Sequence, residues 1–273
     1  MRQVFLGITV AAALALVAGA AGAAGPPSAP VSRCAADAVV SGAGCMDKYE
    51  ASVWRVPEPL GVNRFLVKKV QQGKATVALL AAGGATQLGV RNRDDYAPCA
   101  DGGQNCTDDV YAASLPAVPP SVAITWFQAQ AACENAGKRL PSNAEWQAAV
   151  AGTPDPGGDD GTTECNTANA FKALDTGSRT ACVSARGAFD MVGNLYEWVA
   201  DWVPRSTTCG SWSPAVSPTD DDQCIAGAAA TGEPGALLRG GSFVSGALAG
   251  PLAVLGTNPP SGSNGTVGFR CAR

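Results

Sequence analysis

Histidine is absent from the 273 residues of this chain. Without an imidazole there is no histidine base, no Ser-His-Asp triad and no histidine-based iron or zinc site. Charged residues make up 15%, the formal net charge is −4 and the sequence pI is near 4.9. No basic stripe is available for phosphates, so we expect no nucleic-acid partner.

Long apolar runs are also missing, except at the start. Residues 1–23 carry one positive charge, an apolar run and small residues that end in an Ala-x-Ala step at Ala21 to Ala23. This pattern is typical of a secretory signal peptide. A membrane anchor is the alternative, but no charged stop-transfer flank follows. We therefore expect a secreted or periplasmic protein that does not contact the membrane after cleavage.

About 250 residues remain after cleavage, enough for one large domain with its own core. Residues 24–45 form a Pro-rich lead and a first disulfide loop, and residues 46–273 form the domain. We expect a monomer.

Ten cysteines in an exported chain indicate disulfides, because the compartment is oxidising. Sequence alone does not fix the connectivity. Several cysteines are close neighbours along the chain: Cys34 and Cys45, Cys99 and Cys106, Cys165 and Cys182, Cys209 and Cys224. Cys133 and Cys271 are left over, and a bond between them would tie an early helix to the last strand.

Local signals predict two helices in an α+β, loop-rich chain. Thr125 with Gln128 and Ser142 with Glu145 have the spacing of capping boxes, and Gly137 and Gly152 follow the helical segments. Residues 45–56 alternate as an opening strand does. Residues 73–120 are predicted to be loops, and the chain after residue 152 to be mostly turns.

Four segments in this order carry a family resemblance: "WFQAQAACENAGKRLPSNAEW", "DMVGNLYEW", "RGGSF" and "GFRCAR". Over residues 46–273 the chain resembles the sulfatase-modifying-factor family, whose best known member is the formylglycine-generating enzyme. The resemblance implies a compact, loop-rich α+β domain akin to the C-type lectin fold. It also implies that Cys133 pairs with Cys271.

The family's chemistry depends on residues that this chain lacks. The oxidising enzymes carry two copper-binding cysteines, two and seven residues after the serine of "RGGS". The positions that correspond here are Val244 or Ser245 and Ala249 or Gly250. Neither hydroxyl nor glycine replaces a thiolate. The iron-dependent sulfoxide synthases need three histidines. We therefore expect no copper, no iron and no catalysis; an oxidoreductase with a displaced active site is the alternative.

The resemblance places residues 243–267 on a ligand-facing side, so we expect loops that contact a protein or a glycan. The candidate ligand-binding residues are Phe243, Val244, Ser245, Leu248, Leu255, Thr257, Asn258, Gly262, Asn264, Gly265 and Thr266. The same region resembles variable proteins of diversity-generating retroelements, in which asparagine codons are mutated at adenines. A loop of fixed specificity in a pseudoenzyme is the alternative, and the protein sequence does not separate the two.

Two calcium ions brace loops in the family, and oxygen-bearing side chains occupy the corresponding places here. One predicted site uses Asn169 and Asp175 with the carbonyls of Ala170 and Gly177. The other uses Glu197 and Asn194, with carbonyls from "VGNL". The alternative is that Asp175 lies in an Asx turn and that Glu197 accepts hydrogen bonds from backbone donors.

Some remaining residues are predicted to be structural. Trp126, Trp146, Trp198 and Trp202 are expected in the core, whereas Trp54 and Trp212 are expected to be able to reach the surface. Arg239 and Arg270 are expected to hold loops through carboxylates or carbonyls. The acid-rich segments 155–164 and 219–224 are expected to be solvated turns.

Overall fold

A computed structural model describes residues 34–106 and 110–273. The predicted signal peptide 1–23 and the lead up to residue 33 lie outside this part. Among the described residues no helix combines the length and apolarity that crossing a membrane requires.

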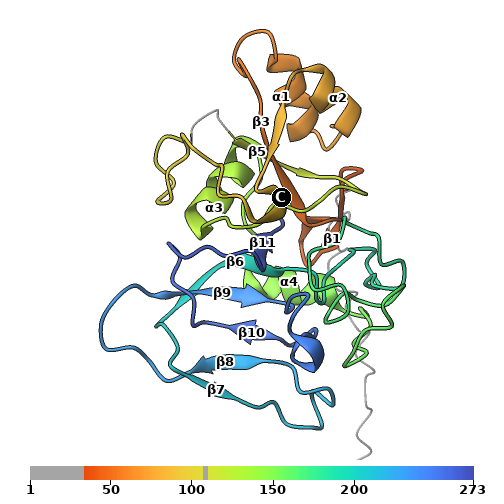
Figure 1. Cartoon of the computed structure of the whole chain (residues 1–273), viewed down its shortest axis with the longest axis vertical. Helices are drawn as coiled ribbons and strands as arrows, with labels where there is room; N and C mark the ends of the chain where they lie inside the picture. The colour runs from red at the N-terminus through yellow and green to blue at the C-terminus, as the bar shows by residue number, and fades with distance from the viewer. Residues whose placement is uncertain (1–33, 107–109) are drawn as a thin grey trace, which may run out of the picture. The chain divides into compact units, whose positions relative to one another are not determined.

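The described chain contains three β-sheets (Figure 1). The small hairpin consists of β1 (Ala38–Ser41) and β2 (Gly44–Asp47). A three-stranded antiparallel sheet has the order β4-β3-β5, with β3 (Ala51–Arg55), β4 (Thr86–Leu88) and β5 (Val110–Ser114). The third sheet has six strands in the order β11-β6-β9-β10-β8-β7.

The six-stranded sheet is built almost entirely from the last third of the chain. Its strands are β6 (Tyr196–Val203), β7 (Thr208–Gly210), β8 (Gln223–Ala226), β9 (Gly235–Arg239), β10 (Val254–Leu255) and β11 (Val267–Phe269). β11 runs parallel to β6, with Gly268 opposite Glu197, and β6 is antiparallel to β9. Most residues after 152 lie in turns and irregular segments, as predicted, but local patterns did not reveal these short strands, because they pair with distant partners.

Both predicted helices form, and their caps set where they begin. α3 (Trp126–Asn135) and α4 (Asn143–Val150) each start with a reciprocal capping box, at Thr125 with Gln128 and at Ser142 with Glu145. Gly137 and Gly152 follow with positive φ values of 67° and 81°, which suit glycine at the end of a helix.

The segment before α3 is more ordered than predicted. Besides β4 and β5 it holds α2 (Val77–Ala82) and a 3-10 turn η1 (Val90–Asn92), and α1 (Arg64–Gln71) precedes it. The prediction of loops over 73–120 is therefore wrong. The expected strand over 45–56 is broken between β2 and β3.

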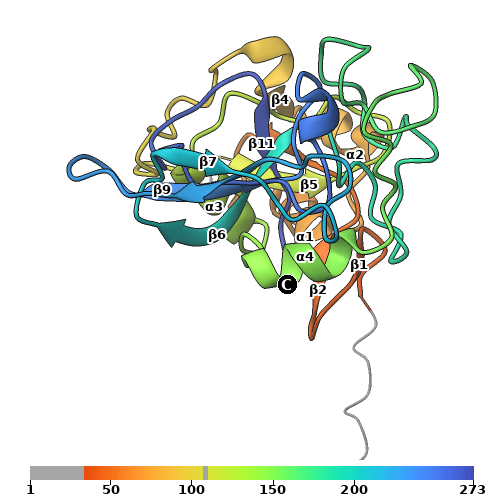
Figure 2. The ribbon, with the colours of Figure 1, turned by 90° about the horizontal axis from the view of Figure 1, so that it is seen from below.

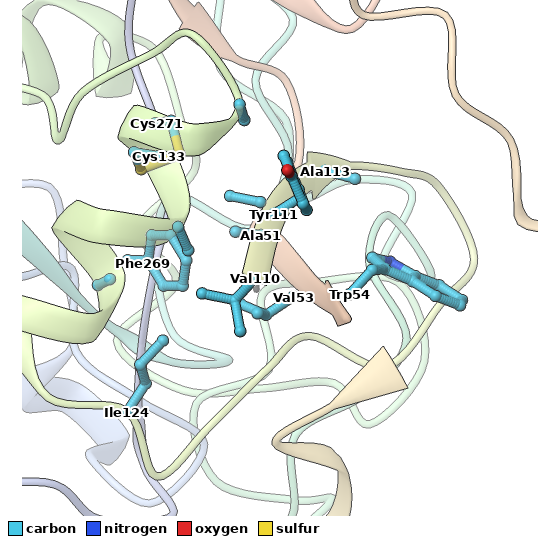
Figure 3. Close-up of a cluster of buried hydrophobic side chains, with 14 of the residues drawn as sticks. Ala51, Val53, Trp54, Val110, Tyr111, Ala113, Ile124, Cys133, Phe269 and Cys271 are labelled. Carbon is cyan, nitrogen blue, oxygen red and sulfur yellow. A yellow bond between two sulfur atoms is a disulfide. The ribbon is translucent and has the colours of Figure 1, made fainter. Parts of the chain in front are cut away.

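The main core lies between the three-stranded sheet, α3 and the β11 edge of the large sheet (Figure 3). Trp146 and Trp198 are fully buried, and Trp126 is half-buried. Trp202, expected in the core, is 44% exposed, and its ring instead packs edge-on against Trp126 and Phe127. Trp54, for which the sequence left a surface position open, is buried.

The C-terminal residues lie beside α4 and β2 (Figure 2). Cys45 and Arg273 exchange two backbone hydrogen bonds, and Ala272 bridges both Met46 and Arg139. Five disulfides join Cys34–Cys45, Cys99–Cys106, Cys133–Cys271, Cys165–Cys182 and Cys209–Cys224. These bonds use all ten cysteines, and the bond between Cys133 and Cys271 links α3 to the segment that follows β11.

A fully buried ion pair connects β6 to the end of the chain. Arg270 donates to both Glu197 oxygens from Nε (2.9 and 2.7 Å) and again from Nη2, and its Nη atoms donate to the carbonyls of Asp47, Lys48 and Phe189. Trp146 Nε1 donates to Glu197 Oε2 at 2.7 Å. The charges are therefore paired and their hydrogen-bonding groups occupied, as burial requires.

Replacing Arg270 by Gln is expected to lower the free energy of unfolding by roughly 3–5 kcal/mol, because Glu197 is left buried without its counter-charge. Arg139→Gln removes an ion pair to Glu145 whose arginine side chain is 46% exposed, and it is expected to cost at most about 1 kcal/mol. Urea unfolding followed by circular dichroism measures both values. Equal losses in the two variants would contradict this assignment.

Candidate ligand-binding face

The "RGGS" segment makes a tight turn after β9. Gly240 and Gly241 have φ values of 87° and 82°, and a Cβ on either would lie 2.8 Å from the Met191 carbonyl oxygen or 2.4 Å from the Ala249 Cβ. Only glycine fits both the backbone conformation and the space. The turn brings residues 243–250 and the 3-10 turn η2 (Gly246–Leu248) beside residues 166–174, where Gly246 N donates to the Thr167 carbonyl.

The positions where the enzymes carry cysteines hold neutral side chains. Ser245 Oγ accepts from Ser242 N and donates to the Tyr196 hydroxyl at 3.1 Å, and Tyr196 donates to Asp222 at 2.9 Å. Burial raises the pKa values of Tyr196 and Asp222. Val244 is exposed, and Ala249 and Gly250 are buried. This chain of hydrogen bonds contains no thiol.

A hollow of about 400 Å³ lies next to Phe243. This volume is within the range of small-molecule sites. The hollow is lined by Arg91, Asn92, Pro119, Pro120, Val122, Phe171, Lys172, Ala173, Asp175 and Phe243. Four separate segments of the chain therefore contribute to one surface feature.

Charged side chains around the hollow are free of protein partners. Among the described residues no hydrogen bond or ion pair involves the side chains of Arg91, Lys172 or Asp175. Arg91, Asn92 and Phe171 have left-handed φ values of 59°, 62° and 52°. Such backbone strain costs of order 1 kcal/mol per residue and clusters at functional sites.

Apolar side chains are exposed on the same face. Phe171 is 77% exposed, Val244 57% and Leu248 47%. Phe243 is buried against Val122 and Leu195 and forms the wall between the hollow and the interior. We call the surface formed by Arg91, Asn92, residues 171–175 and residues 243–248 the loop face.

Only part of the predicted ligand-binding set lies on the loop face. Phe243 lines the hollow, and Val244, Ser245 and Leu248 follow it directly. Gly265 lies beside the Asn92 side chain, next to Asn264 and Thr266, which form a hydrogen-bonded turn at the Asn264 side chain.

The other four predicted residues, Leu255, Thr257, Asn258 and Gly262, take part in core packing, backbone hydrogen bonds and turns. Leu255 is in β10 and packs against the main core. The Asn258 carbonyl accepts from Ala236 N, and the Thr257 hydroxyl donates to the Asn258 side chain. Gly262 closes a turn with Pro259. None of these four residues lines the hollow.

Sequence reasoning missed the contributions of Arg91, Asn92 and Lys172. These residues lie in segments with no motif, one predicted to be loop and the other considered only for calcium. Their approach to Phe243 depends on tertiary packing, so no local signal identifies them.

The second predicted calcium set does not fit an ion as proposed. Glu197 is occupied by Arg270 and Trp146. Asn194 Oδ1 accepts from Asn166 and from Leu174 N, and its amide nitrogen donates to Glu50. Neither side chain offers a free oxygen.

The first set retains free oxygens. Asn169 donates from its side chain to the Asp159 carbonyl, which leaves its Oδ1 without a hydrogen bond among the described residues, and Asp175 is exposed. Within the same part of the chain no three acidic, cysteine or histidine side chains are grouped to hold a metal. A calcium ion would therefore depend on Asn169, Asp175 and the carbonyls of Ala170 and Gly177, and this site stays a prediction.

The structure is a disulfide-tied α+β domain. It places the motifs "GNLYEW", "RGGS" and "GFR" on adjacent strands and turns, and this combination identifies its class. The model of the sulfatase-modifying factor enzyme 1-like domain matches residues 99–273. The chain belongs to this family, and its described residues form the loop-rich, disulfide-tied α+β domain that the motifs implied.

Curated relatives share the domain but are longer. The chain is 35% identical over 160 residues to the serine/threonine-protein kinase pkn1 of Chlamydia pneumoniae, covering 56% of this chain and 24% of that protein. It is 34% identical over 174 residues to the formylglycine-generating enzyme of Streptomyces coelicolor, covering 56% of this chain and 52% of the enzyme. The chain thus spans about a quarter to a half of these relatives.

Solved structures are similar at low identity. The Major Tropism Determinant I1 variant has a TM-score of 0.46 and 17% identity, with 87% of this chain and 52% of that chain covered. CarF has a TM-score of 0.41 and 16% identity, with 84% and 85% covered.

Calcium added after EDTA treatment is expected to raise the melting temperature, because an ion that binds only the folded state stabilises it. Each kcal/mol corresponds to roughly 2–4 °C for a domain of this size. Asp175→Asn is expected to remove most of the rise. Asp220→Asn, at an exposed acid of another loop, is expected to keep it. Calorimetry measures these melting temperatures. If calcium leaves the melting temperature of the wild type unchanged, the site is refuted.

Proposed function

We propose that this protein is a secreted, non-catalytic binding module that presents its C-terminal loops, about residues 243–267, to a protein or glycan ligand. The observation that carries the proposal is the loop face, where exposed apolar side chains and unpaired charges surround a hollow. In the oxidising enzymes of the family this segment carries the copper-binding cysteines.

The state of the cysteines supports a role without catalysis. All ten are in disulfides, so no thiolate is available as a nucleophile or a soft-metal ligand. Ser245 lies at one of the two positions and is held by Ser242 and Tyr196. A serine hydroxyl hydrogen-bonded to a neutral phenol lacks the adjacent base that activates such nucleophiles.

The character of the loop face supports recognition of a partner. Large apolar side chains such as Phe171 are exposed beside buried aromatic Phe243, and charges of both signs lie within the same hollow. Exposed apolar patches rimmed by polar groups are typical of interaction sites. Arg91 and Phe171 have left-handed backbone conformations, and among the described residues their side chains form no hydrogen bond, ion pair or ring contact.

Panning a random-peptide phage library and probing a glycan array test the proposal directly. We expect enriched ligands whose binding falls at least about tenfold in the variant Phe171→Ser/Val244→Ser/Leu248→Ser, because truncating interface anchors costs 1 kcal/mol or more.

The matched control is Leu60→Ser/Val62→Ser/Phe65→Ser, which removes three apolar side chains that are 72%, 79% and 63% exposed near α1. It is expected to bind as the wild type does. If only this variant loses binding, the binding site lies near α1, and the proposal that the loop face binds the ligand is wrong.

Oxygen consumption in the presence of copper and a cysteine-containing peptide is expected to be nil, because the thiolates that the reaction needs are absent. An oxygen electrode measures this, with an oxidising enzyme of the family as positive control. Turnover above the copper blank would instead support the oxidoreductase with a displaced active site.

Diversification of the loops is a finer prediction. Several residues that mutated asparagine codons can reach, such as Val244 and Leu248, are exposed, and Asn264 is exposed as well. A near-copy of the coding sequence for the tail that differs only at adenines, just downstream of the gene, is the expected observation. Its absence favours fixed specificity.

A further inference from the structure

A second hollow, of about 270 Å³, lies between α4 and the strands β8, β9 and β10. It shares no lining residue with the hollow of the loop face. Its apolar lining consists of Val203, Trp212, Ile225, Leu237, Leu252 and Val254. We call it the sheet hollow.

Arg239 forms the polar side of the sheet hollow and is only 3% exposed. Its Nη1 donates to the carbonyls of Leu252 and Ala253, and its Nη2 donates to the Pro251 carbonyl and the Gln147 amide oxygen. These four acceptors are all neutral. Among the described residues no carboxylate forms an ion pair with Arg239, and burial lowers its pKa to about 10.

The charge of Asp221 raises the pKa of Arg239, but the two side chains form no ion pair, and the Asp221 carboxylate accepts from Leu252 N and from the Thr219 hydroxyl. The centre of the Trp146 ring lies 4.6 Å from the Arg239 guanidinium carbon. A buried cation without a direct counter-ion is costly. The site therefore has a place for one negative charge.

Three buried polar atoms of the residues that line the sheet hollow have no partner among the described residues. They are Arg239 Nε, Trp212 Nε1 and Asn143 Oδ1. Buried polar groups are nearly always hydrogen-bonded, so three orphans around one hollow indicate a missing partner. Two of them are donors and one is an acceptor.

We propose that the sheet hollow binds a small monocarboxylate with an apolar body. The carboxylate accepts from Arg239 Nε and Trp212 Nε1, and the apolar body packs against Leu237, Leu252 and Val254. One guanidinium matches one negative charge, whereas a phosphate dianion would need further cations that the lining lacks. Trp212 lies in the loop between β7 and β8, so a shift of its side chain admits the ligand.

Two sources supply this chemistry: a free small acid and the C-terminus of a peptide that ends in an apolar residue. Both present a carboxylate next to an apolar group. The open side of the sheet hollow is marked by Ile225, which is 41% exposed.

The indole N–H signal of Trp212 reports on the site directly. The protein labelled with ¹⁵N at its six tryptophans is titrated with N-acetyl-leucine and with N-acetyl-leucinamide, and Trp212→Phe assigns the signal. We expect N-acetyl-leucine to shift the Trp212 signal and to bind at least about tenfold more tightly than the amide, since hydrogen bonds to a charged group contribute roughly 1.5–3 kcal/mol.

Ile225→Glu places a negative charge at the open side and is expected to weaken binding of N-acetyl-leucine about severalfold by repulsion. Ile225→Gln, of the same size but neutral, is expected to bind within about twofold of the wild type. N-acetyl-Gly-Gly-Leu forms a further arm. If it also shifts the signal, the site accepts chain ends; if only N-acetyl-leucine does, the ligand is a free acid.

The proposal is overturned if N-acetyl-leucine does not shift the Trp212 signal. It is also overturned if N-acetyl-leucinamide binds as tightly as N-acetyl-leucine. Water alone would then be the partner of the three orphan atoms. Neither result bears on the loop face, because phage panning tests residues that the sheet hollow does not contain.

Discussion

The buried pair of Glu197 and Arg270 is the interaction on which the domain depends. Glu197 comes from "GNLYEW" on β6, and Arg270 comes from "GFRCAR" just after β11. The pair pins the parallel contact of these two strands, and Trp146 ties α4 to the same carboxylate. Further carbonyls near β2 accept from Arg270, so one guanidinium joins the start, the middle and the end of the described chain.

The residues that hold the fold together, which form its frame, are separate from those of the loop face. The loop face can therefore differ in its side chains from the active site of the family's enzymes. The caps of α3 and α4, the Gly240–Gly241 turn and the buried ion pair contain no group that takes part in oxygen chemistry. Residues 243–250 leave the frame at Ser242 and are held by a few hydrogen bonds, such as Phe243 N to the Asn194 carbonyl. Val244 and Leu248 are exposed there, so these side chains can change without loss of core contacts, whereas Phe243 and Ala249 remain part of the interior.

Sequence patterns predicted what depends on neighbours in the chain. The capping boxes at Thr125 and Ser142 act over three residues, and most disulfides close short loops. The large sheet escaped prediction because its strands, most of them two to five residues long, pair across long separations, as β10 does with β8 and β9. The sequence did not reveal the contact of Glu197 with Arg270 for the same reason: the two residues are 73 positions apart, and a carboxylate looks identical in sequence whether it faces a metal ion or an arginine.

The two hollows are physically connected although they share no lining residue. Trp212 of the sheet hollow and Asp222 belong to the same loop between β7 and β8, and Asp222 accepts from Tyr196, which accepts from Ser245 on the loop face. The disulfide Cys209–Cys224 closes this loop at its base. A ligand that shifts Trp212 therefore acts on a closed loop whose other end is two hydrogen bonds from Ser245. The loop face and the sheet hollow are thus joined by one disulfide-closed loop and two hydrogen bonds.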